Sequence, residues 1–194
     1  MRFDGAALWY TLEADDLDWL TMVPHLVAAA REIRPDFGAL TTSLLRAEPG
    51  MPPPKSAVIS ALLSELETLH DGRVVVILDD VHTIEDSADA NQLLDRLLRK
   101  APARFSLVLA GGRRPALALA RWAGRGELVE QTTEDLRFSR EDTARLFADS
   151  YGQALEADVL DELESRTQGW AACLQLFRTL VTGQATAVVR MAAR

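Results

Sequence analysis

Short apolar runs alternate with segments of helical periodicity over the first two thirds of the chain. Runs of strand length lie at 7–12, 74–78 and 105–110, and a shorter candidate strand covers 127–131. The run at 74–78 is Val-Val-Val-Ile-Leu, without a polar residue on either face. Such a run is typical of a central parallel strand in a sheet that helices cover on both sides.

The segments between these runs carry apolar residues at helical spacing. They predict helices over 18–33, 40–45, 87–100 and 117–123 and a further helix that follows the proline-rich loop 48–54 and ends at Asp71-Gly72. Pro24 lies inside the first of these helices, so we expect it to kink that helix or to mark a later start.

The pattern changes near Arg137, after which only helices are predicted, over 139–151, 156–167 and 170–181. Ser139 stands three residues before Asp142, which is the spacing of a capping box. Trp170, Cys173 and Leu174 share one apolar stripe of the last helix. The sequence therefore predicts an α/β fold, a parallel sheet flanked by helices, over residues 1–136, and the beginning of an all-helical domain over residues 137–194.

The overall charge excludes some classes of partner. The 29 acidic residues outnumber the 21 basic ones, giving a net charge of −8. A surface of this sign repels phosphate backbones, so we expect no direct binding of nucleic acid by this chain. No apolar run is long enough for a membrane span. The single cysteine, Cys173, allows no internal disulfide and fits a reducing cytoplasm.

The clearest chemical signal is the pair Asp79-Asp80, directly after the apolar run at 74–78. Ligands of open parallel sheets bind outside the carboxyl ends of the strands. An apolar strand that ends in acids is the Walker B arrangement, in which Asp79 would hold Mg²⁺ and Asp80 would orient the attacking water. Alternatively, the two carboxylates simply cap the next helix.

The partner motif of a Walker B strand, the phosphate-binding G-x-x-x-x-G-K-[ST] loop, does not occur in the sequence. The nearest match, Gly50 to Ser56, is one residue short, has Pro54 in place of the glycine and follows no strand. Its three prolines also lack the N–H donors that would cradle a phosphate. We therefore reject it.

Two further features are candidates for ligand contacts. Gly111-Gly112-Arg113-Arg114 follows the strand at 105–110, so either arginine can point at a γ-phosphate, or the segment is a solvated basic turn. Gly169-Trp170 begins a helix, where the indole can touch a ligand base or simply pack.

Five segments in order resemble the ATPase module of MalT-like regulators, which are large bacterial transcriptional activators of the STAND class of signal-transduction ATPases. The segments are ALWYTLEADDLDW, VVVILDDVH, SLVLAGGRRPALALARWAGRGELVE, EDLRFSREDTARLF and LESRTQGWAACLQL, and the resemblance runs from about Ala7 to Leu180. The resemblance implies a P-loop NTPase-like fold that uses ATP or ADP with Mg²⁺.

The resemblance also implies roles for individual residues. Asp79 would be the Walker B magnesium ligand, Asp80 its acidic neighbour and His82 the histidine of the family's DD-x-H pattern. Gly169 and Trp170 would match a Gly-Trp pair behind the nucleotide. The family places Ser-Arg after the fourth strand, with the arginine sensing the γ-phosphate, whereas this chain has Gly111-Gly112 there and Arg113 one place late.

In that family the P-loop strand and helix come immediately before the matched stretch, so the resemblance implies a chain that starts after the Walker A motif. The missing strand would leave 105–110 and 127–131 without their common neighbour. We expect these two strands to pair with each other, or a second copy of the chain to cover the exposed edge. The other implied partner is the remainder of a larger regulator.

Three functional hypotheses follow. The first is a fragment of a MalT-related ATPase that retains Walker B and does not hydrolyse ATP alone. The second is a non-catalytic interaction module that has lost its nucleotide site, which Gly111-Gly112 favours. The third is a metal-dependent phosphoesterase that uses Asp79, Asp80 and His82, although no further His/Asp cluster completes a two-metal site.

Overall fold

The chain divides into two compact units, Met1–Arg121 (unit 1) and Trp122–Arg194 (unit 2), each of which is described by itself. The computed structural model describes residues 5–46 and 53–179. Most of the predicted loop at 48–54 and the end of the predicted helix at 170–181 lie outside these ranges. No helix within them is long and apolar enough to cross a bilayer.

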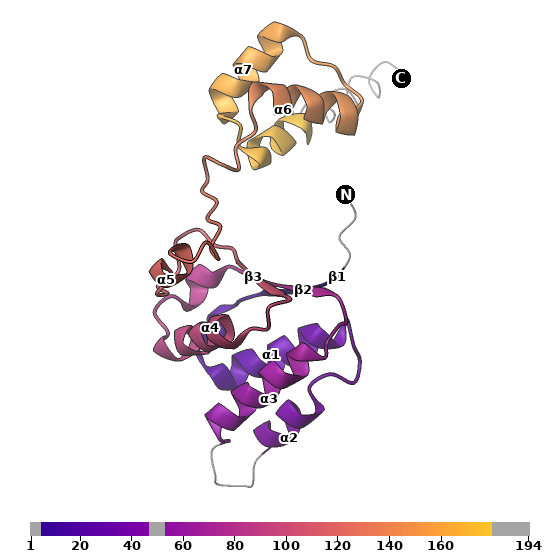
Figure 1. Cartoon of the computed structure of the whole chain (residues 1–194). Coiled ribbons are helices and arrows are strands. Elements are labelled where there is room, and N and C mark those ends of the chain that lie inside the picture. Colours follow the sequence, from indigo (N-terminus) through magenta and orange to yellow (C-terminus); the bar gives the residue numbers. More distant parts are fainter. Residues whose placement is uncertain (1–4, 47–52, 180–194) are drawn as a thin grey trace. The chain divides into compact units, whose positions relative to one another are not determined.

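Unit 1 is built on a parallel sheet of three strands in the order β1-β2-β3 (Figure 1). The strands are β1 (Gly5–Thr11), β2 (Arg73–Asp79) and β3 (Phe105–Leu109). In register, Trp9 lies opposite Ile77, and Ile77 lies opposite Val108. The prediction that the run at 74–78 forms the central strand of a parallel sheet is confirmed.

The fourth predicted strand, at 127–131, is wrong. These residues join no sheet, and they do not pair with the outer edge of β3. The segment has no apolar face to bury, because its central residue, Val129, is 87% exposed and Glu127 and Glu130 flank it. Within the part of the chain that the structure describes, β3 therefore keeps one edge without a strand, and cover by a second copy stays a prediction.

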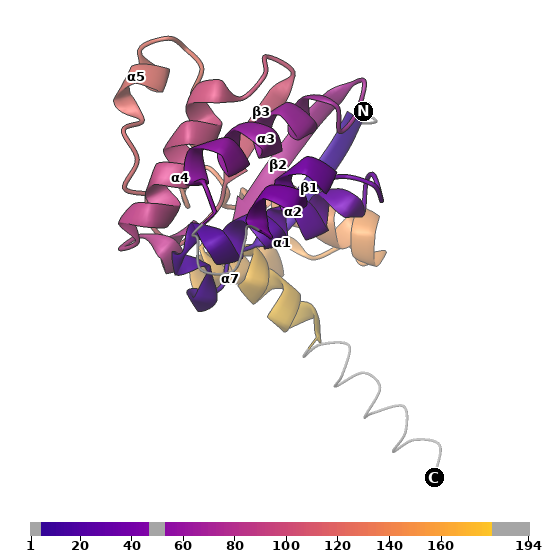
Figure 2. The ribbon, with the colours of Figure 1, turned by 90° about the horizontal axis from the view of Figure 1, so that it is seen from below.

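Four helices lie on the same face of the sheet, as Figures 1 and 2 show: α1 (Trp19–Arg31), α2 (Ala39–Leu45), α3 (Lys55–Glu67) and α4 (Ala88–Lys100). Right-handed crossovers that all step in one direction along a sheet place every helix on one side. Val74, Val76 and Leu78 are therefore buried, whereas Val75 and Ile77 on the other face are only half-buried. The predicted α/β fold, a parallel sheet flanked by helices, is confirmed, but within unit 1 the described helices lie on one face of β2 and not on both.

The helices end where local chemistry stops them. Asp18 caps α1 by accepting a hydrogen bond from the backbone N–H of Leu20 (2.9 Å), and Ser87 caps α4. Pro24 lies inside α1, and the helix begins at Trp19 all the same, so the proline does not delay the start. The predicted helix at 117–123 is shorter than expected and forms only over α5 (Ala120–Ala123).

Unit 2 is helical, as predicted. It contains α6 (Arg140–Arg145), the π-helical turn η3 (Leu146–Ser150), α7 (Ala157–Thr167) and a helix over residues 171–179. The capping box is confirmed, because Ser139 accepts from the N–H of Asp142 and the Asp142 carboxylate accepts from the N–H of Ser139. Phe147, Leu163 and Leu174 form the small core.

Candidate functional site at the carboxyl end of the sheet

Asp79 and Asp80 lie where β2 ends, at the carboxyl edge of the sheet. Asp79 is the last residue of the strand, is half-buried, and accepts a hydrogen bond from the backbone N–H of Asp80 at 3.0 Å. The backbone of Asp80 has the left-handed conformation (φ 55°), and the turn η2 (Val81–Ile84) follows it. The Asp80 carbonyl accepts from the N–H (2.9 Å) and the hydroxyl (2.8 Å) of Thr83. Thr83 thereby holds the strained turn in place.

His82 lies beside Asp80 on the same turn. Its Nδ1 atom is 3.7 Å from Asp80 Oδ1, which is too long for a hydrogen bond, and that buried nitrogen has no hydrogen-bond partner among the described residues. Residues 5–46 and 53–179 also contain no group of three or more His, Cys, Asp or Glu side chains that can hold a metal ion. The geometry thus supplies two carboxylates and an imidazole without the additional ligands that a phosphoesterase requires.

The end of β3 packs tightly against η2. The Ala110 carbonyl accepts from the N–H of Val81 (3.0 Å), and a Cβ atom on Gly111 would lie 3.1 Å from a methyl group of Val81. A glycine is well suited to this close approach. Arg113 follows on the surface, 75% exposed, and its guanidinium is 3.5 Å from the carboxylate of Glu85. The structure therefore places Arg113 at the same edge as Asp80, in a solvated ion pair.

The end of β1 contributes a buried carboxylate that the sequence analysis missed. Asp16, on the turn η1 (Ala14–Leu17), has a side chain only 1% exposed. It accepts from the N–H of Glu13 at 2.8 Å and from Nδ1 of His25 at 2.9 Å, and Tyr10 Oη is 2.8 Å from the same His25 nitrogen. Its one visible signal was the capping-box spacing from Glu13 to Asp16.

The environment of Asp16 shifts two pKa values. Burial of Asp16 alone would raise its pKa, but the hydrogen bonds from Glu13, Tyr10 and His25 outweigh the burial and lower it. Burial and the neighbouring Asp16 carboxylate raise the pKa of the Tyr10 phenol far above its usual value. Asp16 is therefore ionised at neutral pH and Tyr10 keeps its proton.

The β1 turn is also tied to the candidate site. The N–H of Leu12 donates to the carbonyl of Asp79 at 2.9 Å, and the Thr83 hydroxyl is 3.4 Å from the Leu12 carbonyl. The turns that follow β1 and β2 are therefore hydrogen-bonded to each other. The turn after β1 carries Asp16 and its network, and the turn after β2 begins at Asp80.

Gly169 and Trp170 belong to unit 2. Gly169 has φ +72°, and a Cβ atom there would lie 2.1 Å from the carbonyl oxygen of Phe138, whose N–H donates to the Gly169 carbonyl at 2.8 Å. Gly169 is thus required for close backbone packing. Trp170 does not join the core with Leu174 as the apolar stripe predicted, because its side chain points out of that core and is 62% exposed.

Asp79 and Asp80, in unit 1, are the residues that could hold Mg²⁺. Adjacent carboxylates at a strand end are the oxygen ligands that Mg²⁺ prefers. The other half of a magnesium–nucleotide site, a run of backbone N–H groups that would cradle phosphates, has no counterpart in the Walker A sense anywhere in the sequence.

No family model matches the chain, but its sequence is similar to parts of several large characterised proteins. The serine/threonine-protein kinase PknK of Mycobacterium tuberculosis is 30% identical over 174 residues, which are 89% of this chain and 15% of PknK. The transcriptional regulators MalT of Vibrio parahaemolyticus and Vibrio cholerae are 24% and 25% identical over 168 residues, or 87% of this chain.

The chain spans about 15–18% of the length of these relatives, so the similarity concerns one part of much larger proteins. Almost the whole of the present chain takes part in it, including both units. The resemblance drawn from the five sequence segments is thereby confirmed: the chain is a relative of the MalT-type transcriptional regulators and of PknK.

Proposed function

We propose that the chain is the nucleotide-binding scaffold of a MalT-related, ATP-dependent transcriptional regulator, and that it does not hydrolyse ATP by itself. The observation that carries this proposal is the position of Asp79 and Asp80 at the carboxyl end of the central strand of a parallel sheet. Open α/β sheets bind their ligands at this edge.

In this proposal each candidate residue has one role. Asp79 would hold Mg²⁺, which neutralises phosphate charge when ATP is bound, and Asp80 would orient the attacking water. Arg113 would leave Glu85 to reach the terminal phosphate. Gly169 would fix the backbone beside Phe138 within unit 2, and Trp170 would be an exposed indole that is available to a ligand base.

The free edge of β3 and the open face of the sheet are consistent with a phosphate-binding segment that comes from elsewhere in a larger polypeptide. A strand that precedes β1 in the chain and pairs with the free edge of β3 would reach β1 by stepping opposite to the other crossovers. Its right-handed connection would therefore lie on the open face. That face presents the apolar row of Trp9, Ile77 and Val108, with Trp9 60% and Val108 43% exposed. A strand–P-loop–helix unit would bury this row.

The proposal is tested with two chains. Calorimetric titration of ATP and ADP with Mg²⁺ into the present chain should show no binding up to millimolar concentrations. A chimera in which a strand–P-loop–helix segment of a MalT-type regulator is joined in front of Gly5 should bind ATP, and Asp79→Asn should remove the magnesium dependence. Binding by the present chain tighter than about 100 μM, equivalent to about 5.5 kcal/mol, would contradict the proposal, as would a folded chimera without affinity.

One observation favours the second hypothesis, a non-catalytic interaction module. Arg113, the arginine nearest to the family's sensor position, forms an ion pair with Glu85, and Gly111 packs tightly against Val81. In that case the chimera would fold, bury Trp9 and bind no nucleotide, so the same experiment separates the two hypotheses.

A further inference from the structure

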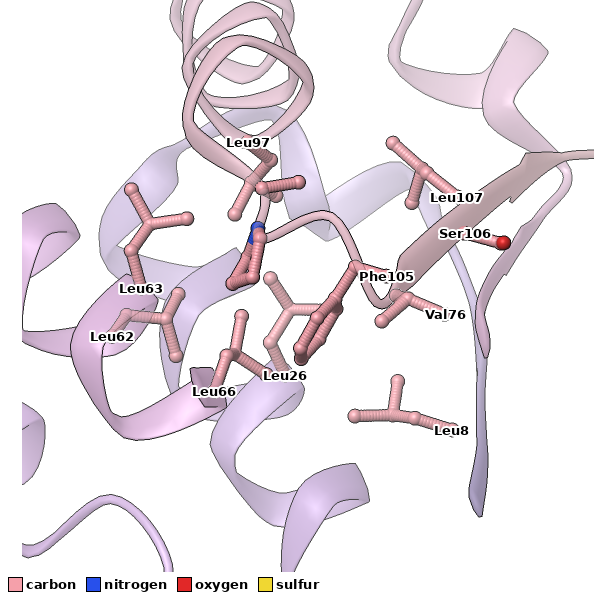
Figure 3. A pocket seen from close by; sticks show the side chains of 12 residues that line it. Leu8, Leu26, Leu62, Leu63, Leu66, Val76, Leu97, Phe105, Ser106 and Leu107 are labelled. Carbon is pink, nitrogen blue, oxygen red and sulfur yellow. The ribbon is translucent and has the colours of Figure 1, made fainter. Parts of the chain in front are cut away.

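Unit 1 contains an apolar cavity of about 30 Å³ between leucine side chains of β1, α1, α3 and α4 and the ring of Phe105 (Figure 3). Its one polar lining residue is Ser106, whose hydroxyl points away from the leucine side chains in Figure 3. A water needs about 10–15 Å³ on this measure and about two to four polar partners, so the cavity is a small gap in the packing of the core. Outside the candidate nucleotide site, the chemistry of unit 1 lies instead at the histidine that contacts Asp16.

His25 lies on α1, where two neighbours fix one of its ring nitrogens. Its Nδ1 atom is 2.9 Å from Oδ1 of Asp16 and 2.8 Å from the Tyr10 hydroxyl, and the Tyr10 and His25 rings meet edge-on with 5.7 Å between their centroids. The Asp16 carboxylate also accepts the N–H of Glu13 and is ionised, so it has no proton to donate. The proton of the hydrogen bond to Asp16 therefore belongs to Nδ1, and the lone pair of the neutral ring is on Nε2.

The same geometry leaves Nε2 of His25 open to solvent. The side chain of Asp16 is 1% exposed and that of His25 is 51% exposed, so the ring edge toward Asp16 is buried and the edge that carries Nε2 is accessible. Nε2 forms no hydrogen bond with a residue in the described ranges. A carboxylate that holds the Nδ1–H group of an imidazole fixes its orientation and makes Nε2 more basic and more nucleophilic.

The other two histidines of the chain, His70 and His82, are also described by the structure, and both lack this arrangement. Nδ1 of His70 accepts the backbone N–H of Gly72 at 2.9 Å, so its neutral ring carries the proton on Nε2 and has no free lone pair. Nδ1 of His82 is buried and has no hydrogen-bond partner among the described residues. Of the three histidines, only His25 combines an Nδ1–H group held by a carboxylate with an exposed Nε2.

We propose that His25 is a phosphorylation site, at which Nε2 accepts a phosphoryl group from a small N-phosphate (a compound with a phosphorus–nitrogen bond). The Nε2 lone pair attacks phosphorus, a new N–P bond forms at the ring, and the bond from phosphorus to the donor nitrogen breaks. That nitrogen is protonated in the donor and leaves as a neutral amine. The ring keeps its Nδ1 proton and becomes a cation, whose charge faces the Asp16 carboxylate.

The stability of the product favours phosphate over other groups. A phosphoryl group persists on an imidazole at neutral and alkaline pH, whereas an acyl group is soon lost to water. The inference is independent of the nucleotide proposal, because it uses neither Asp79 nor the open face of the sheet.

The probe is phosphoramidate, whose leaving group is ammonia, added to the full chain in mildly alkaline buffer. Peptide mass spectrometry gives the rate of labelling at each histidine, and phosphorus NMR identifies the ring nitrogen. His25 should take up phosphate on Nε2 at least fivefold faster than His70 and His82 do. Equal rates at the three histidines, or phosphate on Nδ1 of His25, would overturn the proposal.

Two matched variants separate the effect of the Asp16 hydrogen bond from that of charge. Asp16→Asn and Asp15→Asn each remove one negative charge from the same turn, and Asp15 is exposed. Because phosphoramidate is an anion, a charge effect alone would speed the labelling of His25 in both variants. Loss of the carboxylate at Nδ1 should instead slow it at least threefold in Asp16→Asn, whereas Asp15→Asn should leave it unchanged or slightly faster. An increase in both variants would refute the assignment.

A third variant, His25→Gln, identifies the signal. The phosphorus resonance of the Nε2-phosphorylated ring should disappear in His25→Gln, and a resonance that persists there would contradict the proposal. If Asp16→Asn does not fold, the comparison of the three histidines in the unmodified chain still decides the question.

Discussion

Removal of the Asp16 charge tests the network beneath the β1 turn. Asp16→Asn keeps the size of the side chain and replaces one acceptor oxygen with an NH₂ group. The buried carboxylate receives the N–H of Glu13 and Nδ1 of His25, so one donor would then face another donor. Asp15, its neighbour, is exposed, and Asp15→Asn changes the net charge by the same amount.

The expected cost follows from these contacts. A hydrogen bond to a charged group contributes about 1.5–3 kcal/mol, and a buried polar group left without a partner costs about 1–3 kcal/mol. His25 is half exposed and recovers part of its loss through water. We therefore expect Asp16→Asn to lower the free energy of unfolding by about 2–3 kcal/mol, and Asp15→Asn to change it by less than about 0.5 kcal/mol.

The assay is urea unfolding followed by tryptophan fluorescence, at pH 7 and at steps down to pH 3. Because the pKa of Asp16 is lowered in the folded state, its stabilisation is present above the unfolded pKa of about 4 and is lost as the pH falls through the folded value. The difference between the original chain and Asp16→Asn should therefore shrink in acid. A difference at pH 7 no larger than that of Asp15→Asn, or one that persists undiminished in acid, would refute the reasoning.

Three further predictions concern single contacts. Glu65 on α3 accepts hydrogen bonds from the N–H groups of Leu40 (2.9 Å) and Thr41 (3.1 Å) and so caps α2 from another helix. Glu65→Ala should lower the free energy of unfolding, measured by thermal unfolding, by about 1–2 kcal/mol. An effect no larger than that of Glu67→Ala, at an exposed position, would contradict this prediction. Gly169→Ala should cost at least about 3 kcal/mol because its Cβ meets Phe138, whereas Gly152→Ala, at a similar φ with open space around it, should cost only about 1 kcal/mol in urea unfolding. Arg113→Ala removes an exposed ion pair and should change the unfolding free energy by less than about 0.5 kcal/mol in the same assay, so a larger loss would show that Arg113 supports the fold.

The sequence was sufficient where one short segment carries the whole signal. The unbroken apolar run at 74–78 identified the central strand, because such runs are typical of the inner strands of parallel sheets, although in unit 1 only Val74, Val76 and Leu78 are fully buried. The Ser139–Asp142 spacing located the start of α6, since a capping box closes within one turn. Prediction failed at 127–131, where two apolar residues between glutamates leave the segment without an apolar face to bury against a sheet.

The candidate site divides in the same way. Asp79 and Asp80 were visible because both follow one apolar run, whereas Asp16 and His25 are nine residues apart and meet only when η1 folds back on α1. Likewise the cavity near Phe105 depends on side chains from several elements. The sequence by itself determined the class of fold, the strand that carries the acidic pair and the helical second unit. Only the tertiary structure decided which face of the sheet stays open and which polar groups are buried together, because both depend on crossover direction and on contacts between distant segments.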